Sequence, residues 1–249
     1  YDEMVMAVSK IKKAISEIET AEKAEEEKIL RQKKDEEDYY NSIKTARNKV
    51  FAYKVYLQKF PTGNHTEEAK TEVEKFLKSW MTKNLDTDHY SNGDEIPEVG
   101  TLDRWNKKEW SKLTSGAWIS GRNLGNYYNG YAVKDKRGLC PSGWHVPTIE
   151  EWQTLVYILG GQEVAGGKLK EKGVTNWKSP NLGATDEIGF CALPYGYLSP
   201  YEDTYYYIMK GEAGCWWSSE GNSVYIDYES ASIIVGAPQT PGSGLSVRC

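Results

Sequence analysis

In the first 60 residues the apolar side chains recur every three or four positions, which places them along one side of a helix. The positions are Met4, Val8, Ile11, Ile15, Ile18, Ile29, Tyr39, Ile43, Ala46, Val50, Tyr53, Leu57 and Phe60. Between Ala21 and Asp38 polar residues interrupt the stripe, at Glu22, Glu25, Gln32 and Glu36. The pattern predicts a helix with a solvated, charge-rich middle. A coiled coil would need a partner to cover Ile11, Ile15 and Ile18.

A second helix is predicted beyond a break at Pro61 and Gly63, with Thr66 placed to cap it. Its inner face contains Ala69, Val73, Phe76, Leu77 and Trp80. The Tyr-Leu-x-x-Phe-Pro-x-Gly turn followed by Glu-Ala resembles a single tetratricopeptide-type hairpin over about residues 38–79. One such unit buries little alone. We therefore expect residues 1–79 to be a spacer, or an arm for docking or self-association.

The pattern changes at Trp80, because all nine Trp and eight of the nine Pro lie at or beyond this residue. Thr148 and Glu151 form a predicted capping box, and Gly160-Gly161 ends the helix that follows. Short β-branched or aromatic segments predict antiparallel strands at Tyr205–Met209, Cys215–Ser218, Val224–Tyr228, Ser232–Val235 and Leu245–Cys249. The sequence thus predicts a helical segment over 1–79 and an α+β domain over 80–249.

An ordered series of motifs runs through this second part. It comprises WM..NL from Trp80, CPSGWHVPT from Cys140, GGKLK from Gly166, GF.ALP.GY from Gly189, WWSS from Trp216 and a final SVRC. The series resembles the Fibrobacter succinogenes major paralogous domain, found in surface and secreted proteins of Bacteroidetes. That family is similar to the C-type-lectin-like fold, which implies short antiparallel strands and two helices. The resemblance to this family implies no settled biochemical activity.

Four cysteines allow three disulfide pairings. The resemblance implies Cys140–Cys249, because in the lectin-like fold the last strand packs beside a helix and a long-range bridge there is usual. Cys191 and Cys215 each follow or precede an aromatic residue in segments expected to be neighbours, and we predict a second bridge between them. Both are unusual positions for Cys in the family.

Candidate chemistry begins with Cys140 and His145, which lie five residues apart. A catalytic dyad needs a thiolate beside its base, and nothing enforces that contact here. We interpret Trp144 and His145 as packed beneath the following helix. No His pair has the spacing of metal ligands, so we predict no metal and no cofactor. Because formylglycine-generating enzymes share the lectin-like fold, a thiol enzyme using Cys191 or Cys215 is the alternative.

Aromatic side chains remain as candidates for a binding face. The candidate residues are Tyr195, Tyr197, Tyr201, Tyr205 and Tyr206. Tyr offers rigid apolar area with a polar group, which suits contacts with sugars or proteins. Trp216 and Trp217 lie in the middle of a predicted strand, and we assign them to the core.

A net charge of −5 provides no basic surface for nucleic acid. Mean hydropathy is −0.66, and no apolar run reaches the length of a bilayer span. The start at Tyr1 suggests a trimmed form, with any signal or lipid anchor outside the chain. We expect a non-catalytic bacterial protein, extracellular or on the outer-membrane surface, that binds a glycan or a surface protein through aromatic loops.

Overall fold

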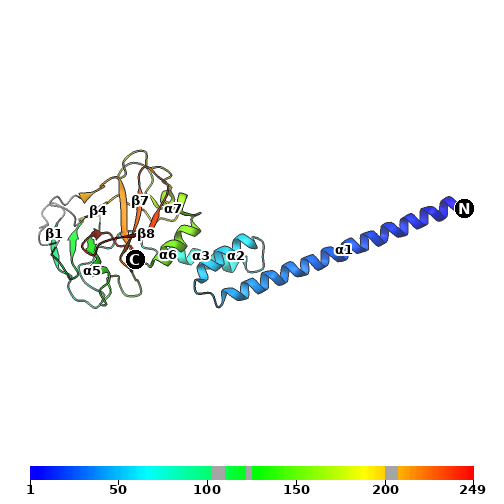
Figure 1. Ribbon diagram of the computed structural model, residues 1–249, viewed down its shortest axis with the longest axis horizontal. Helices are drawn as coiled ribbons and strands as arrows, with labels where there is room; N and C mark the ends of the chain where they lie inside the picture. The colour runs from blue at the N-terminus through cyan, green and yellow to red at the C-terminus, as the bar shows by residue number, and fades with distance from the viewer. Residues whose placement is uncertain (102–109, 111, 122–124, 200–206) are drawn as a thin grey trace. The chain divides into compact units, whose positions relative to one another are not determined.

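The computed structural model describes residues 1–101, 110, 112–121, 125–199 and 207–249. The chain divides into two compact units, Tyr1–Val73 and Glu74–Cys249 (Figure 1). The division falls within helix α3 (Thr66–Lys78). The predicted boundary between residues 79 and 80 stays a prediction.

The first unit contains α1 (Asp2–Ile43), α2 (Lys49–Lys59) and the first part of α3. The prediction of one helix over residues 1–60 is wrong, because α1 ends at Ile43. The Asn48 side chain accepts a hydrogen bond from the Phe51 N–H and so caps a separate helix, α2. Thr66 is the first residue of α3, and its hydroxyl donates to the Phe60 carbonyl at 3.2 Å.

The end of α1 completes the hairpin formed by α2 and α3. Glu36 is buried and accepts hydrogen bonds from Tyr56 Oη at 2.6 Å and from the Asn64 N–H. A Cβ atom at Gly63 would collide with both Tyr56 and Glu36, so the turn requires glycine there. Ile43 joins the buried cluster that also contains Tyr56 and Ala69. The neighbour that a single hairpin needs is therefore supplied by this chain itself.

The second unit is an α+β domain with two sheets, which confirms the predicted fold class. The larger sheet has the order β1 (Glu98–Thr101), β2 (Trp118–Ser120), β3 (Tyr127–Asn129), β9 (Gly244–Leu245), β4 (Tyr197–Leu198) and β5 (Tyr207–Ile208). Only β1 and β2 pair in parallel among these strands. The smaller, antiparallel sheet contains β6 (Ala213–Trp217), β7 (Asn222–Asp227) and β8 (Ile234–Pro238).

Three further helices are described in this unit, where the family resemblance implied two: α5 (Gly130–Val133), α6 (Ile149–Ile158) and α7 (Gln162–Leu169). The predicted capping box of α6 is confirmed. Thr148 Oγ1 accepts from the Glu151 N–H at 3.1 Å, and the Glu151 carboxylate accepts from the Thr148 N–H at 2.8 Å.

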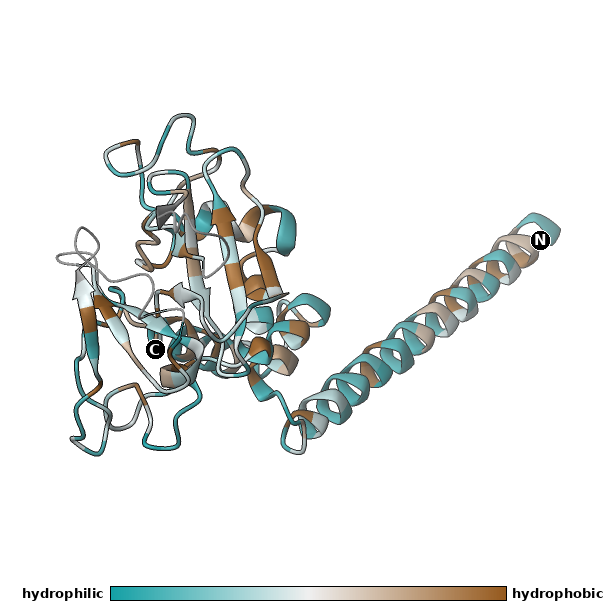
Figure 2. Ribbon diagram, turned by 60° about the vertical axis from the view of Figure 1, so that its left-hand side comes forward, coloured by the Kyte–Doolittle hydropathy of each residue, from teal (hydrophilic) through white to brown (hydrophobic). Residues whose placement is uncertain are grey.

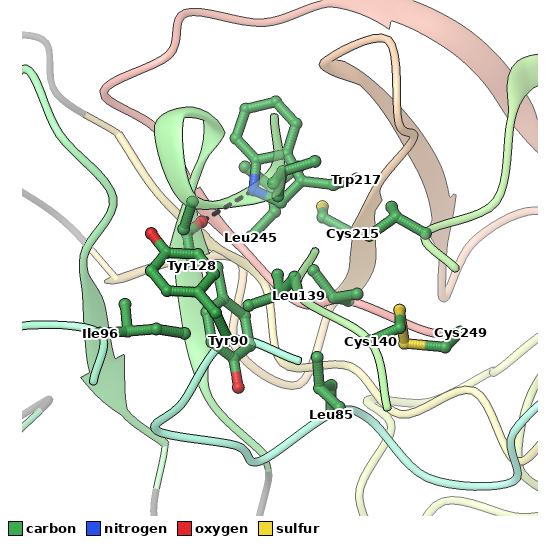
Figure 3. Packing of buried hydrophobic residues seen from close by; sticks show 14 of the residues in the cluster. Leu85, Tyr90, Ile96, Tyr128, Leu139, Cys140, Cys215, Trp217, Leu245 and Cys249 are labelled. Carbon is green, nitrogen blue, oxygen red and sulfur yellow. Dashed lines mark hydrogen bonds between the residues drawn. A yellow bond between two sulfur atoms is a disulfide. The ribbon is translucent and has the colours of Figure 1, made fainter. Parts of the chain in front are cut away.

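Strand β6 of the smaller sheet is buried on both faces, where successive side chains point in opposite directions. Trp216 belongs to the cluster that contains Trp152 of α6. Trp217 and Cys215 belong to the cluster of Tyr128 and the disulfide (Figure 3). Trp217 Nε1 donates to the Tyr128 carbonyl at 2.8 Å. The assignment of both tryptophans to the core is confirmed.

A buried arginine, Arg248, joins three distant segments of the domain. Its guanidinium donates to Asn84 Oδ1 at 2.8 and 3.2 Å, to the Met81 carbonyl at 2.9 Å and to the Phe190 carbonyl. Its charge also lies 4.3 Å from the centre of the Phe190 ring. Burial lowers the pKa of Arg248, because the charged form has left water. Trp216 Nε1 also donates to Asn84 Oδ1, so the first, middle and last motifs meet at one amide oxygen.

Cys140 and Cys249 form the predicted disulfide, with Cα atoms 6.1 Å apart. The predicted Cys191–Cys215 bridge is wrong, because both cysteines are free. Phe190 packs against Trp216 at 5.8 Å between ring centres, on the face of β6 opposite to Cys215. Cys191 follows Phe190 in a turn with φ of 50° and donates its N–H to Asp186. Strand alternation therefore turns Cys215 away from Phe190, the residue that precedes Cys191.

Replacing Arg248 with Met should lower the free energy of unfolding by about 3–5 kcal/mol, since the Met81 and Phe190 carbonyl oxygens would lose their side-chain donor and Asn84 Oδ1 would keep the one from Trp216. Urea denaturation followed by fluorescence measures the change. Arg137→Met is the control, because Arg137 is partly exposed and pairs with Asp94 and Asp135. Its loss should lower stability much less, because exposed ion pairs are screened by water. Equal stability of wild type and Arg248→Met would refute the role of this arginine.

Alkylation of the unfolded chain without reductant should add two groups, at Cys191 and Cys215, and four groups after reduction. Intact-mass spectrometry with peptide mapping reads both numbers. Labelling of Cys140 before reduction would contradict the Cys140–Cys249 disulfide. A chain that is not labelled at all before reduction would show that Cys191 and Cys215 form a second disulfide.

Candidate functional site

The loop from Cys140 to Pro147 is fixed at both ends. The disulfide holds its start. At its end the Pro147 carbonyl accepts from the Ser219 N–H at 2.9 Å. The carboxylate of Glu220 accepts from the Ile149 N–H and so anchors the beginning of α6 to the turn after β6. The residues between these anchors are thus held in place by covalent and hydrogen bonds on either side.

Between the anchors the chain turns outward. The Trp144 N–H donates to the Pro141 carbonyl at 2.9 Å, and Gly143 has φ of 85°, which favours glycine. The prediction that Trp144 and His145 pack beneath the helix is wrong. Trp144 is 41% exposed, and the His145 side chain is 67% exposed. The tight turn before Trp144 is the sequence signal that could have indicated this, because it reverses the chain just before the indole.

His145 is paired with an acidic residue of α6 instead of the backbone. Its Nε2 lies 2.8 Å from Glu151 Oε1 and 3.0 Å from Oε2. The same carboxylate accepts from the Thr148 N–H and hydroxyl at 2.8 and 3.0 Å. Glu151 therefore caps the helix and orients the imidazole at the same time. His145 is held facing solvent, with Nδ1 as its second polar ring atom.

A pocket of about 460 Å³ lies beside this loop, within the second unit. It is lined by Lys75, Phe76, Lys78, Ser79, Trp80, Gly143, Trp144, His145, Pro147, Glu151 and Cys249. Phe76 meets Trp80 edge to face at 6.0 Å, and Trp80 packs on Trp152 at 4.7 Å. The apolar wall therefore continues into the core and is rigid. This volume lies in the range of small-molecule sites, and the pocket combines aromatic walls with a few polar groups.

The tyrosines predicted as a binding face lie elsewhere. Tyr195 is buried and packs in the cluster of Trp110 and Tyr127, so its proposed role as an exposed platform is wrong. Tyr197 is partly buried in β4, where desolvation raises its pKa. Tyr201, Tyr205 and Tyr206 lie outside the described residues.

The free thiols show no arrangement for nucleophilic chemistry. Cys215 is buried, and desolvation raises its pKa. The pKa of Cys191 is also raised, first by desolvation and then by the charges of Asp186 and Glu171. Both groups are therefore protonated at neutral pH, whereas the nucleophile is the thiolate.

In the described part of the chain, no group of three or more His, Cys, Asp or Glu is placed to hold a metal ion. Among the helices described, none is long and apolar enough to cross a membrane.

Comparison with known proteins gives one finding. A family model described as the Fibrobacter succinogenes major domain matches residues 77–249, which include the loop, α6 and most of the pocket. No curated protein and no solved structure matches the chain. The family predicted from the motifs is confirmed: this chain belongs to the Fibrobacter succinogenes major domain family.

Proposed function

We propose that the domain of residues 74–249 is a non-catalytic binding module at a bacterial cell surface, and that the pocket beside Trp144 binds glycan. The observation that carries the proposal is the half-exposed indole of Trp144, held on an anchored loop next to the paired His145 and Glu151. An exposed Trp on a rigid support is unusual, because most large aromatic side chains are buried.

A sugar ring has the chemistry that this pocket would recognise. Its apolar C–H face fits the indole of Trp144, and its hydroxyl groups fit the imidazole and the carboxylate of Glu151. Lys75 and Lys78 add cations to the lining. Because the loop and α6 are fixed by the disulfide and the capping box, little ordering is required on binding.

The location at the cell surface is supported by the disulfide. A bridge between Cys140 and Cys249 persists in an oxidising compartment and is rare in the cytosol. Tyr201, Tyr205 and Tyr206 remain predicted contacts for the glycan.

The thiol-enzyme alternative lacks support in the geometry. A formylglycine-type reaction would need a reactive thiol, and the pKa values of Cys191 and Cys215 are both raised. Because the thiolate is the nucleophile, the raised pKa values do not favour catalysis.

Trp144→Ala should weaken glycan binding at least tenfold, equivalent to about 1.4 kcal/mol, through loss of the stacking surface. Binding is measured first on an array of bacterial, plant and host polysaccharides, then by calorimetry with the best glycan. Phe51→Ala is the matched control, because Phe51 has the same 41% exposure but lies on α2 in the first unit. It should bind like the wild type.

Two results would overturn the proposal. One is a wild-type chain that binds no polysaccharide on the array while binding a surface protein. The other is a Trp144→Ala variant that is folded and retains full glycan affinity.

A further inference from the structure

The side chains along one face of α1 follow an uninterrupted heptad spacing, with steps of four and three in alternation. The positions are Met4, Val8, Ile11, Ile15, Ile18, Glu22, Glu25, Ile29, Gln32, Glu36, Tyr39 and Ile43. A mean step of 3.5 residues is the repeat of a left-handed coiled coil. In Figure 2 hydrophobic residues recur along the helix between hydrophilic ones.

The two ends of this face have different surroundings. At the C-terminal end, Glu36 and Ile43 are buried against α2 and α3. At the N-terminal end the side chains are exposed to water, at 66% for Met4, 47% for Val8, 59% for Ile11, 49% for Ile15 and 57% for Ile18. Five apolar side chains in consecutive heptad positions therefore remain in contact with solvent, at a cost that burial would recover.

The flanks of the exposed face suit a second helix. The heptad positions that would meet a second helix form the seam. One residue before seam positions lie Ala7, Ala14 and Ala21, whose small side chains allow close approach. On the outer side, Lys13 and Glu17 are 3.8 Å apart and well exposed. From Lys10 to Thr20 the apolar side chains thus follow the heptad face, with charged residues on the opposite side.

We propose that residues 4–18 of α1 pack against the same residues of a second copy of this chain in a short coiled coil. A second copy has a face of the same period and length, and the β-branched side chains of Val8, Ile11, Ile15 and Ile18 suit knobs-into-holes packing. Glu22 and Glu25 end the apolar seam, so the association is short and reversible.

This inference is independent of the proposed glycan binding, since each can hold without the other. If both hold, one assembly carries two Trp144 pockets. Two linked sites raise the avidity for a repeating polysaccharide without any new contact.

The test compares two charge-matched double variants of the full chain by sedimentation velocity from about 1 to about 200 µM. Ile11→Glu with Ile15→Glu places two charges in the seam. Ser9→Glu with Ser16→Glu places the same two charges on the outer side of the helix. All four positions are exposed in a single chain, so neither variant should unfold α1. Circular dichroism verifies the helix content.

The wild type and the Ser variant should shift with concentration from 28.2 kDa to at least twice that mass. The Ile variant should remain at the monomer mass, with association weakened at least about 100-fold, because four apolar contacts are lost in each pair of chains. A wild type that is monomeric throughout, or two variants that are weakened equally, would overturn the inference.

Discussion

The fold of the second unit depends on the hydrogen bonds that replace water around one buried cation, the guanidinium of Arg248. Arg248 is 1% exposed, and its guanidinium donates to carbonyl oxygens of Asn84, Met81 and Phe190. These oxygens replace the water that a guanidinium loses on burial. Without Arg248 the Met81 and Phe190 carbonyls would lose its hydrogen bonds, while Asn84 Oδ1 would still accept from Trp216 Nε1. The Met81 N–H also donates to the Cys249 carbonyl, and the Leu85 N–H donates to Val247, so the first and last motifs are held side by side. Formation of the Arg248 site thus requires three segments to be in place together.

Most of the motif residues belong to the core, although Trp80 and Cys249 also line the proposed binding pocket. One buried network contains Asn84 from WM..NL, Phe190 from GF.ALP, Trp216 from WWSS and Arg248 from SVRC. The CPSGWHVPT motif contributes differently: its first residue forms a disulfide and its Thr148 caps α6, while Trp144 is displayed to solvent between them. A rigid core next to an anchored loop is a suitable support for a recognition site.

Local chemistry explains which features the sequence could predict. The capping box at Thr148 and Glu151 depends on residues three apart, so it was predictable from spacing, whereas the exposure of Trp144 depends on a turn that spacing does not describe. The Cys191–Cys215 pairing failed because residue neighbourhoods do not reveal which face of β6 a side chain occupies. The buried role of Arg248 was not predictable from local sequence, because its hydrogen-bond partners lie more than 50 residues away in the chain. The break after Ile43 contains no Gly or Pro, and only Asn48 signals a new helix.

Trp144 is proposed to stack on the ligand, whereas Trp216 and Trp217 lie in the core. The most direct measurement is the set of indole N–H resonances in a two-dimensional ¹H–¹⁵N NMR spectrum during titration with the bound polysaccharide. The Trp144 resonance should shift, while those of Trp216 and Trp217 should stay in place because their N–H groups donate hydrogen bonds to Asn84 and Tyr128. A Trp144 resonance that does not move while polysaccharide binds would contradict the proposed stacking.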